Sequence, residues 1–461
     1  MNDYDVIVLG GGSAGTSAAS AAAAAGARTA TVNDGELGGL CILRGCMPTK
    51  ALLATAHAVH EANHLDPFGA RLEGRTVVDF TRVMQRKSDQ VARFKRAKIE
   101  SIESADYEML PGRARFAECG GVEVDGRRLT AKRYVIATGS TPSSLPIPGI
   151  DDIPLLTSDD VMRLTTQPRR LLVQGAGPIG LELAQFFARI GTEVLLVNRS
   201  PLLWRYDRPC GVELTRALAD EPRLELVVPG RIETLRPDGD GLRATIIGAA
   251  GARQWQADAL LMATGRRADL DDLGLEHACI EQDTDSLAHD DAMRTSNPDV
   301  YVAGDATGRR QILHVANQEG RVAGHNAAVG KPERRIDYRL MMQVVFTDPP
   351  CAFVGASEAE AHERGHDLVI GETRFDETGR AITMETRHGL WRLLADRTSG
   401  EILGSAIVGP RADDLIHLVA LMMRYGGKVG DIPDLPWYHP TLSEVMQNLG
   451  RAILGQSPRE F

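Results

Sequence analysis

The sequence contains no hydrophobic run long enough to cross a membrane. Its most apolar helical stretch, residues 18–25, is rich in alanine, far shorter than a bilayer span, and directly follows a glycine-rich turn. We therefore expect a packed helix there and no membrane segment. No basic segment followed by an apolar stretch and a cleavage site stands at the N-terminus, so we also expect no secretory signal and a cytoplasmic location.

Positive charge is neither in excess nor concentrated. The chain has 52 Lys and Arg against 62 Asp and Glu, a formal net charge of -10, and no Lys/Arg block that could form a nucleic-acid-binding arm. Acidity spread thinly over a chain favours solubility and argues against binding to a phosphate backbone. The 461 residues are too many for one core, so we expect two to four domains.

Cysteine is scarce and scattered, which excludes a scaffold held together by disulfides. Only two of the six cysteines lie close together, Cys41 and Cys46. The remaining cysteines are Cys119, Cys210, Cys279 and Cys351. A zinc site would need two more ligands at a regular spacing, and no second Cys or His pair is visible, so we expect no metal site.

The sequence does contain two glycine-rich turns in the same context. Residues 6–9 and 171–174 are strand-like apolar runs, and each precedes a Gly-x-Gly-x-x-Gly turn and an Ala/Leu-rich helical stretch. Such glycines let the backbone approach a pyrophosphate, and the helix N-terminus supplies N–H donors and positive potential. Two copies in this context argue against ordinary tight turns and predict two dinucleotide-binding sites. Their glycines are Gly10, Gly12, Gly15, Gly175, Gly177 and Gly180.

The residues that follow the second strand of each repeat bear on the choice of cofactor. In the first repeat they are Asn33 and Asp34, and an amide can still bond a ribose hydroxyl where an acidic residue is usual. In the second they are Asn198 and Arg199, with Arg205 nearby. No carboxylate repels a 2′-phosphate there, and two guanidinium groups could hold one, so we predict NADPH in preference to NADH. The alternative is that both arginines are solvated surface charges.

Similar sequence motifs and a change in the predicted secondary structure divide the chain into domains. Two strand-like runs end at Gly139 and Gly265, which we include among the cofactor-binding residues, and a third ends at Asp305. Strand and helix patterns typical of an α+β domain begin near residue 341. We predict an α/β fold with two Rossmann-like dinucleotide-binding domains and a C-terminal α+β dimerisation domain. The predicted segments are 1–148 and 268–340 for the first domain, 149–267 for the second and 341–461 for the third.

The two neighbouring cysteines lie in the phrase GGLCILRGCMPTK, which leads into a helical stretch. Cysteines five residues apart can bridge where the backbone turns at a helix start, and Gly45 eases that turn. A helix N-terminus, Arg44 and Lys50 would lower the pKa of a thiol, and the thiolate is the species that exchanges. The flanking glycines argue against two inert buried cysteines, so we predict a redox-active pair.

A histidine near the C-terminus also stands out. His439, in the phrase HPTLSE, is followed five residues later by Glu444. Across a helix start such a pair can form a base and the group that orients it. A His-Pro step also occurs at helix starts without any chemistry, so the residues alone leave both interpretations open.

Together these motifs resemble the class I pyridine nucleotide–disulfide oxidoreductases, a family that includes dihydrolipoyl dehydrogenase, glutathione reductase and mercuric reductase. The resemblance covers essentially the whole chain, and its most specific parts are GGLCILRGCMPTK, the two glycine turns, VYVAGDATG and HPTLSE. It implies a homodimeric enzyme that uses FAD and NAD(P)H. Two electrons would pass through a Cys41–Cys46 disulfide to a small disulfide or lipoyl-type substrate.

The resemblance also implies roles for single residues. The first turn would bind the FAD pyrophosphate, Asp305 the ribityl–phosphate region, and the second turn the nicotinamide cofactor. Lys50 and Glu182 would form the pair beside the flavin ring. Cys46 would be the thiol next to the flavin, and Cys41 the thiol that exchanges with the substrate.

His439, oriented by Glu444, would then be the acid–base group, supplied by the partner subunit, so that the homodimer has shared active sites. Some positions depart from the family. Leu43-Arg44 replaces the usual Asn-Val between the cysteines, and Arg44 would favour an anionic substrate. Trp437-Tyr438 replaces the polar lead-in common in dihydrolipoyl enzymes.

The substrate stays open on these grounds. The arginines of the second cofactor site resemble mercuric and glutathione reductases, whereas HPTLSE favours a lipoyl-like enzyme. Against a mercuric reductase, the chain has no vicinal cysteine pair near its C-terminus, and His439 stands where that enzyme usually has Tyr. We predict a dihydrolipoyl dehydrogenase-like disulfide oxidoreductase, with an NADPH-dependent mercuric reductase-like enzyme as the alternative.

Two other classes of function remain open. A flavin transhydrogenase or diaphorase would pass hydride to another acceptor without the cysteines, so Cys41→Ser would leave its activity intact. A redox sensor or flavoprotein scaffold would oxidise NAD(P)H slowly with every acceptor and form a stable complex with a partner. The completeness of the motif set favours the disulfide oxidoreductase.

Overall fold

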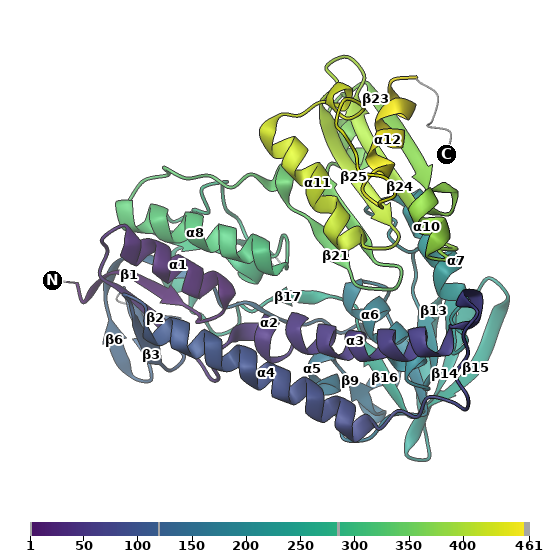
Figure 1. Cartoon of the computed structure of the whole chain (residues 1–461). Helices are drawn as coiled ribbons and strands as arrows, with labels where there is room; N and C mark the ends of the chain where they lie inside the picture. Colours follow the sequence, from purple (N-terminus) through teal and green to yellow (C-terminus); the bar gives the residue numbers. More distant parts are fainter. Residues whose placement is uncertain (1, 119, 284–285, 456–461) are drawn as a thin grey trace. The chain divides into compact units, whose positions relative to one another are not determined.

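The structure is a computed structural model that describes residues 2–118, 120–283 and 286–455 (Figure 1). Cys119 lies outside the described residues. The chain forms two compact units. The first comprises Met1–Ala51, Met84–Ser143 and Gly265–Asp337, and the second comprises Leu52–Val83, Ser144–Thr264 and Tyr338–Phe461.

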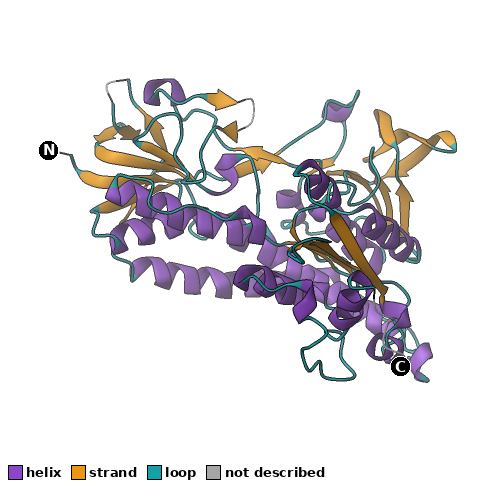
Figure 2. Ribbon diagram, turned by 90° about the horizontal axis from the view of Figure 1, so that it is seen from above, coloured by secondary structure: helices purple, strands orange, loops and turns teal. Residues whose placement is uncertain are grey.

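A parallel five-stranded sheet forms the centre of the first unit, in the order β20-β7-β1-β2-β3. Its strands are β1 (Tyr4–Leu9), β2 (Thr29–Asn33), β3 (Glu108–Pro111), β7 (Ala131–Ile136) and β20 (Val300–Val302). Strand β1 is buried almost throughout and β7 is buried in its second half, as expected where both faces of a sheet are covered. Figure 2 shows helices lying along the strands that begin near the N-terminus.

The opposite face of this sheet carries a separate apolar core. Ile7, Leu9 and Ile136 pack there with Phe116 and Val122, which belong to a small antiparallel sheet of β4 (Ala114–Phe116), β5 (Val122–Val124) and β6 (Arg127–Leu129). The unit also contains α2 (Gly39–Leu43), β8 (Ser140–Pro142), β17 (Arg266–Ala268), β18 (Gln282–Asp283), β19 (Ser286–Leu287) and η4 (Gly304–Thr307). The boundary with the second unit falls within α3 (Cys46–Asn63) and α4 (Phe80–Glu103).

Helices α1 (Ser13–Ala24) and α8 (Leu313–Val329) pack with their backbones in direct contact. A Cβ added at Gly320 would lie 2.3 Å from the carbonyl oxygen of Ala14, and one at Gly324 would lie 2.0 Å from that of Ala18. Only small residues allow so close an approach. The alanine-rich run is therefore a packed helix, as the sequence predicts.

The second unit contains another parallel sheet, in the order β12-β11-β10-β16-β9. Its strands are β9 (Leu155–Leu156), β10 (Arg170–Gln174), β11 (Glu193–Val197), β12 (Leu224–Val227) and β16 (Ala259–Met262), with helices α5 (Ser158–Val161), α6 (Pro178–Arg189) and α7 (Arg208–Ala219). Leu172, Leu195 and Leu260 form a core with Ile246 and Trp255. The last two belong to an antiparallel sheet of β13 (Arg231–Asp238), β14 (Gly241–Gly248) and β15 (Gly251–Ala257).

The C-terminal part of the second unit is an antiparallel sheet, in the order β21-β22-β25-β24-β23. Its elements are β21 (Gln343–Val345), β22 (Cys351–Gly355), α9 (Glu358–Glu363), β23 (Leu368–Arg374), α10 (Gly379–Thr383), β24 (Leu390–Asp396), β25 (Ile402–Val408), α11 (Ala412–Tyr425) and α12 (Val445–Ile453). One apolar core joins this sheet to α11 and α12, and its members include Trp391, Ile407, Ile416 and Leu449.

Two buried ion networks stabilise the second unit. Arg392 on β24 donates to Glu372 (2.6 Å), Glu358 (3.2 Å) and Asp207. Asp207 also caps α7 by accepting the N–H of Cys210 at 2.9 Å. This network therefore ties the start of α7 to the C-terminal sheet.

The second network lies beside α6. Arg189 contacts Glu221 at 2.6 Å and Asp348 at 2.8 Å, and Nδ1 of His57 lies 3.2 Å from Asp348. His60 lies 4.0 Å from Glu221, and burial lowers its pKa to about 4, with the charge of Arg189 acting in the same direction.

The predicted fold class is confirmed: two Rossmann-like domains and a C-terminal α+β domain. The division into four numbered segments stays a prediction. In the described part of the chain, no helix has both the length and the apolar character needed to span a membrane.

Candidate active site

The turn between α2 and α3 brings the two neighbouring cysteines together. Cys41 is buried on α2, and Cys46 is the first residue of α3. A Cβ at Gly45 would lie 3.0 Å from the carbonyl oxygen of Leu40 and 3.3 Å from Cα of Cys41. Glycine at this position thus lets the chain fold back on α2. No disulfide joins the two cysteines in the structure, and their side chains share a hydrogen bond.

The expected lowering of thiol pKa does not hold for Cys41. Its hydrogen bond with Cys46, burial of the thiol and the charge of a neighbouring thiolate raise the pKa of Cys41. Lys50 acts in the expected, opposite direction but is the weaker influence. Arg44 is exposed. Because the pKa of Cys41 is raised, a base has to take the proton of this thiol before its sulfur can attack.

The first glycine turn connects β1 to α1. A Cβ at Gly15 would lie 1.8 Å from the carbonyl oxygen of Gly10, so the helix can begin only with glycine there. No side chain caps the helix at Gly12, and no described atom lies within 4 Å of a Cβ built on it. The N-terminus of α1 thus faces open space, as a dinucleotide cradle requires.

Asn33 has a role that the sequence did not reveal. Its Oδ1 accepts the N–H of Gly11 at 3.2 Å, and its Nδ2 donates to the carbonyl oxygen of Gly35 at 3.0 Å. The oxygen of the amide therefore ties the end of β2 to the glycine turn, and its nitrogen holds the segment that follows β2. The neighbouring Asp34 is exposed.

Asp305 lies in η4, within a buried polar group. It accepts the hydroxyl of Ser140 at 2.6 Å, and Arg266 donates to the same hydroxyl at 2.8 Å and to the Ser140 carbonyl at 2.7 Å. Burial raises the pKa of Asp305, while Ser140 and Arg266 act in the opposite direction. Gly139 precedes Ser140 and Gly265 precedes Arg266, both with positive φ.

Sequence reasoning missed Ser140 and Arg266. The available signal was that each follows the Gly of an Ala-Thr-Gly phrase, and the two phrases lead into strands that pair, β8 with β17.

The second glycine turn repeats the first in detail. A Cβ at Gly180 would lie 2.0 Å from the carbonyl oxygen of Gly175, and no described atom lies within 4 Å of one at Gly177, which begins α6 without a side-chain cap. Asn198 accepts the N–H of Ala176 at 3.2 Å and donates to the carbonyl oxygen of Ser200 at 2.6 Å. The amide of Asn198 therefore contacts the second glycine turn in the same way as the amide of Asn33 contacts the first.

Two exposed arginines follow β11. Within the described residues neither Arg199 nor Arg205 forms an ion pair, and the guanidinium of Arg205 lies 4.9 Å from the ring centroid of Trp204. Both side chains are therefore available to an anionic group near the end of β11.

Glu182 and the C-terminal histidine lie in the second unit. Glu182 on α6 is buried, and its Oε1 accepts the N–H of Phe346 at 3.0 Å. Nδ1 of His439 lies 3.0 Å from Oε2 of Glu444. Glu444 is only 4% exposed, whereas more than half of the His439 side chain is exposed. The buried carboxylate therefore orients a ring that solvent and substrate can reach.

The order of these elements agrees with a known protein family. The model of the pyridine nucleotide-disulphide oxidoreductases matches residues 4–320, and the model of their dimerisation domain matches residues 341–449. The chain belongs to the class I pyridine nucleotide–disulfide oxidoreductases. It is therefore an oxidoreductase of a family that depends on FAD and uses NAD(P)H.

Relatives that are named for different activities have similar sequence identity to this chain. The chain is 34% identical to a mercuric reductase of Bacillus cereus (96% of this chain, 70% of that one). It is also 34% identical to a dihydrolipoyl dehydrogenase of Thermus scotoductus (99% of each). The structure matches the Cu(II) complex of the HOCl-induced flavoprotein disulfide reductase RclA from Escherichia coli, with a TM-score of 0.83, 25% identity and coverage of 96% of this chain and 99% of that one.

The residues present fit both nucleotides. Each glycine turn leaves open space at an uncapped helix N-terminus, which is suited to a pyrophosphate. In contrast, no group of three or more His, Cys, Asp or Glu in the described part of the chain could hold a metal ion.

Proposed function

We propose that this oxidoreductase is an NADPH-dependent disulfide reductase that passes two electrons through Cys41 and Cys46 to a small disulfide, of lipoyl type or a similar thiol. The observation that carries the proposal is the hydrogen-bonded thiol pair at the turn between α2 and α3. A pair of inert cysteines would not need Gly45 to bring the two sulfur atoms together.

The first glycine turn and Asp305 would hold FAD, and the second turn would hold the nicotinamide nucleotide. When bound, the flavin supplies two-electron transfer from the reduced nicotinamide to the Cys41–Cys46 disulfide. Asn33 and Asn198 keep the two turns in the shape that leaves each helix N-terminus open. Lys50 and Glu182 are proposed to lie beside the flavin ring.

The thiols then carry out exchange. A base takes the proton of Cys41, and its thiolate attacks one sulfur of the substrate disulfide, forming a mixed disulfide and releasing one substrate thiolate. Cys46 attacks the sulfur of Cys41, which closes the Cys41–Cys46 disulfide and releases the second thiolate. His439 is the proposed base and then the acid that protonates the leaving thiolate, with Glu444 holding its ring.

His439 would act from the partner subunit of a homodimer. The match of residues 341–449 to the dimerisation domain of the family supports this proposal. Because each active site would combine residues of two subunits, dissociation of the dimer should abolish turnover.

The test is an anaerobic titration of the FAD-loaded enzyme with NADPH. After one equivalent, we expect long-wavelength absorbance from the Cys46 thiolate next to oxidised flavin. Cys46→Ser should remove this absorbance, and Cys41→Ser should show it before any reductant is added. Cys279→Ser, at an exposed cysteine, is the matched control and should behave as the wild type.

Bleaching of the flavin without that absorbance, together with full turnover in Cys41→Ser, would overturn the proposal in favour of a transhydrogenase or diaphorase. Uniformly slow NADPH oxidation with every acceptor, with a stable protein complex, would favour a sensor or scaffold.

Reduction of a soft metal ion is the second candidate function. It is supported by the mercuric reductase relatives and by the Cu(II) complex of the RclA structure. Against it, the sequence has no cysteine after Cys351 that could pass a metal ion to the dithiol. Comparing NADPH oxidation rates with Hg(II), Cu(II), lipoamide and glutathione disulfide separates the candidates.

A further inference from the structure

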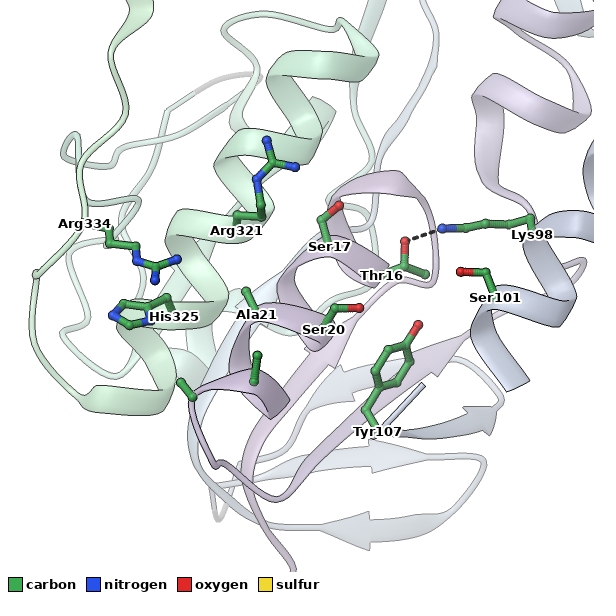
Figure 3. Close-up of a pocket in the computed structure, with 12 residues that line it drawn as sticks. Thr16, Ser17, Ser20, Ala21, Lys98, Ser101, Tyr107, Arg321, His325 and Arg334 are labelled. Carbon is green, nitrogen blue, oxygen red and sulfur yellow. Dashed lines mark hydrogen bonds between the residues drawn. The ribbon is translucent and has the colours of Figure 1, made fainter. Parts of the chain in front are cut away.

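A pocket in the first unit lies along the side of α1 that follows the first glycine turn. An open pocket of about 490 Å³ is formed by the side of α1, the end of α4, the residue that precedes β3, and α8 with the segment after it (Figure 3). Its α1 wall runs from Thr16 to Ala25, along the helix and away from the turn at Gly12. The volume is in the range of small-molecule sites.

The lining of this pocket is basic. Lys98, Arg321 and Arg334 project toward it from three segments, and His325 lies beside Arg334 in Figure 3. None of the described residues that line it is Asp or Glu. The chain as a whole has a formal net charge of -10, so a pocket lined by three cations and a histidine differs in charge from the rest of the protein.

Three of these cations have no acidic partner in the part of the chain that the structure describes. Lys98 is partly buried and donates to the hydroxyl of Thr16 at 2.8 Å, and burial lowers its pKa. Within the described residues, no carboxylate contacts Lys98, Arg321 or Arg334, whereas Nε2 of His325 lies 3.0 Å from Glu333. An anion bound in the pocket would therefore meet these positive charges without displacing a carboxylate of the described residues.

The rest of the lining suits the organic part of a ligand. Ser20 and Ser101 present hydroxyl groups, and Tyr107 presents a ring and a phenol. Alanines of α1 form a smooth apolar wall. The close backbone packing of α1 against α8 holds this wall and the arginine-bearing helix in fixed register, so the pocket is built into the fold.

We propose that this pocket binds a small organic molecule that carries phosphate groups. Arg321 and Arg334 would hold phosphate oxygens by charge-assisted hydrogen bonds, Lys98 would neutralise further charge, and the alanine wall would accept the organic part. The proposal does not depend on the substrate or the nicotinamide of the active site.

The test is calorimetric titration of the FAD-loaded enzyme, with excess NADP⁺ present to fill the second glycine turn. The probes are inorganic phosphate, pyrophosphate and fructose 1,6-bisphosphate. We expect saturable binding, tightest for the bisphosphate. Arg321→Gln with Arg334→Gln should weaken it by about 25-fold, since both side chains are exposed and each charge-assisted hydrogen bond then contributes about fivefold.

The matched control is Arg93→Gln with Arg96→Gln, which removes the same charge from exposed positions of α4 outside the pocket. It should bind the bisphosphate like the wild type. Ser20→Leu should weaken the bisphosphate more than inorganic phosphate, because its side chain fills the apolar part. Disulfide reduction should not change in any of these variants.

Equal losses in the two double variants would show diffuse electrostatic attraction and overturn the site. Absence of saturable binding of any of the three probes to the wild type at millimolar concentration would overturn it as well.

Discussion

Replacing Arg199 and Arg205 with Gln should remove the preference for NADPH while leaving NADH turnover intact. Both side chains are exposed, follow β11, and have no acidic partner in the described part of the chain, so nothing in the protein needs to be broken when a 2′-phosphate binds. A solvent-exposed charge-assisted hydrogen bond contributes about 1 kcal/mol, or about fivefold. The double variant should therefore lose about 25-fold in kcat/KM for NADPH.

The assay is steady-state NADPH and NADH oxidation with one disulfide acceptor at constant ionic strength, because salt screens exposed charges. The matched control is Arg223→Gln with Arg236→Gln, two exposed arginines of the same unit. It should change kcat/KM for both nucleotides by less than about twofold, as surface substitutions do. Equal losses for NADPH and NADH in the Arg199/Arg205 variant, or a wild type that prefers NADH, would refute the reasoning.

Three further outcomes follow from the structure. Arg392→Met should lower the free energy of unfolding, measured in urea, by about 3–5 kcal/mol, because it leaves Asp207 buried without its cation. Adding Asp207→Asn should recover part of this loss, and additive losses from the two single substitutions would contradict the coupling. Burial lowers the pKa of His60 to about 4, so the free energy of unfolding should fall by at most about 3 kcal/mol as the pH falls from about 6.5 to 4. His60→Gln should flatten this part of the curve of stability against pH, and an unchanged curve in the variant would exclude the effect. Glu444→Gln should lower kcat with disulfides by about 10- to 100-fold, because His439 loses the carboxylate that orients its ring. Stopped-flow measurement should show unchanged reduction of the flavin by NADPH, and slower flavin reduction would instead indicate a structural role for Glu444.

Local motifs made much of the fold and of the site predictable. Each glycine turn depends on contacts within about thirty residues, between one strand, one helix and the next strand, so its residue pattern alone identifies it. The pair Cys41 and Cys46 depends on one turn, and the pair His439 and Glu444 on one helix start. Strand and helix patterns likewise predict a C-terminal α+β domain, which belongs to the confirmed fold class.

Contacts between distant segments could not be predicted in this way. The partners of Asp305 are Ser140, 165 residues away, and Arg266, which reaches Ser140 across 126 residues. The raised pKa of Cys41 depends on its burial and its hydrogen bond, which residue types and helix position do not reveal. A sequence shows which charges exist, but only the fold shows which of them are buried or paired.

By itself, the sequence determined the family, the fold class and the two glycine turns, because each is encoded in short, local patterns. It also supplied the residues that are proposed for exchange. The tertiary structure alone decided that Asn33 and Asn198 contact the glycine turns and that burial and a hydrogen bond raise the pKa of Cys41. It also decided that a pocket between α1, α4 and α8 is lined by arginines with no acidic partner among the described residues. These properties depend on distances and solvent exposure between segments far apart in the chain, and those are set only when the chain packs.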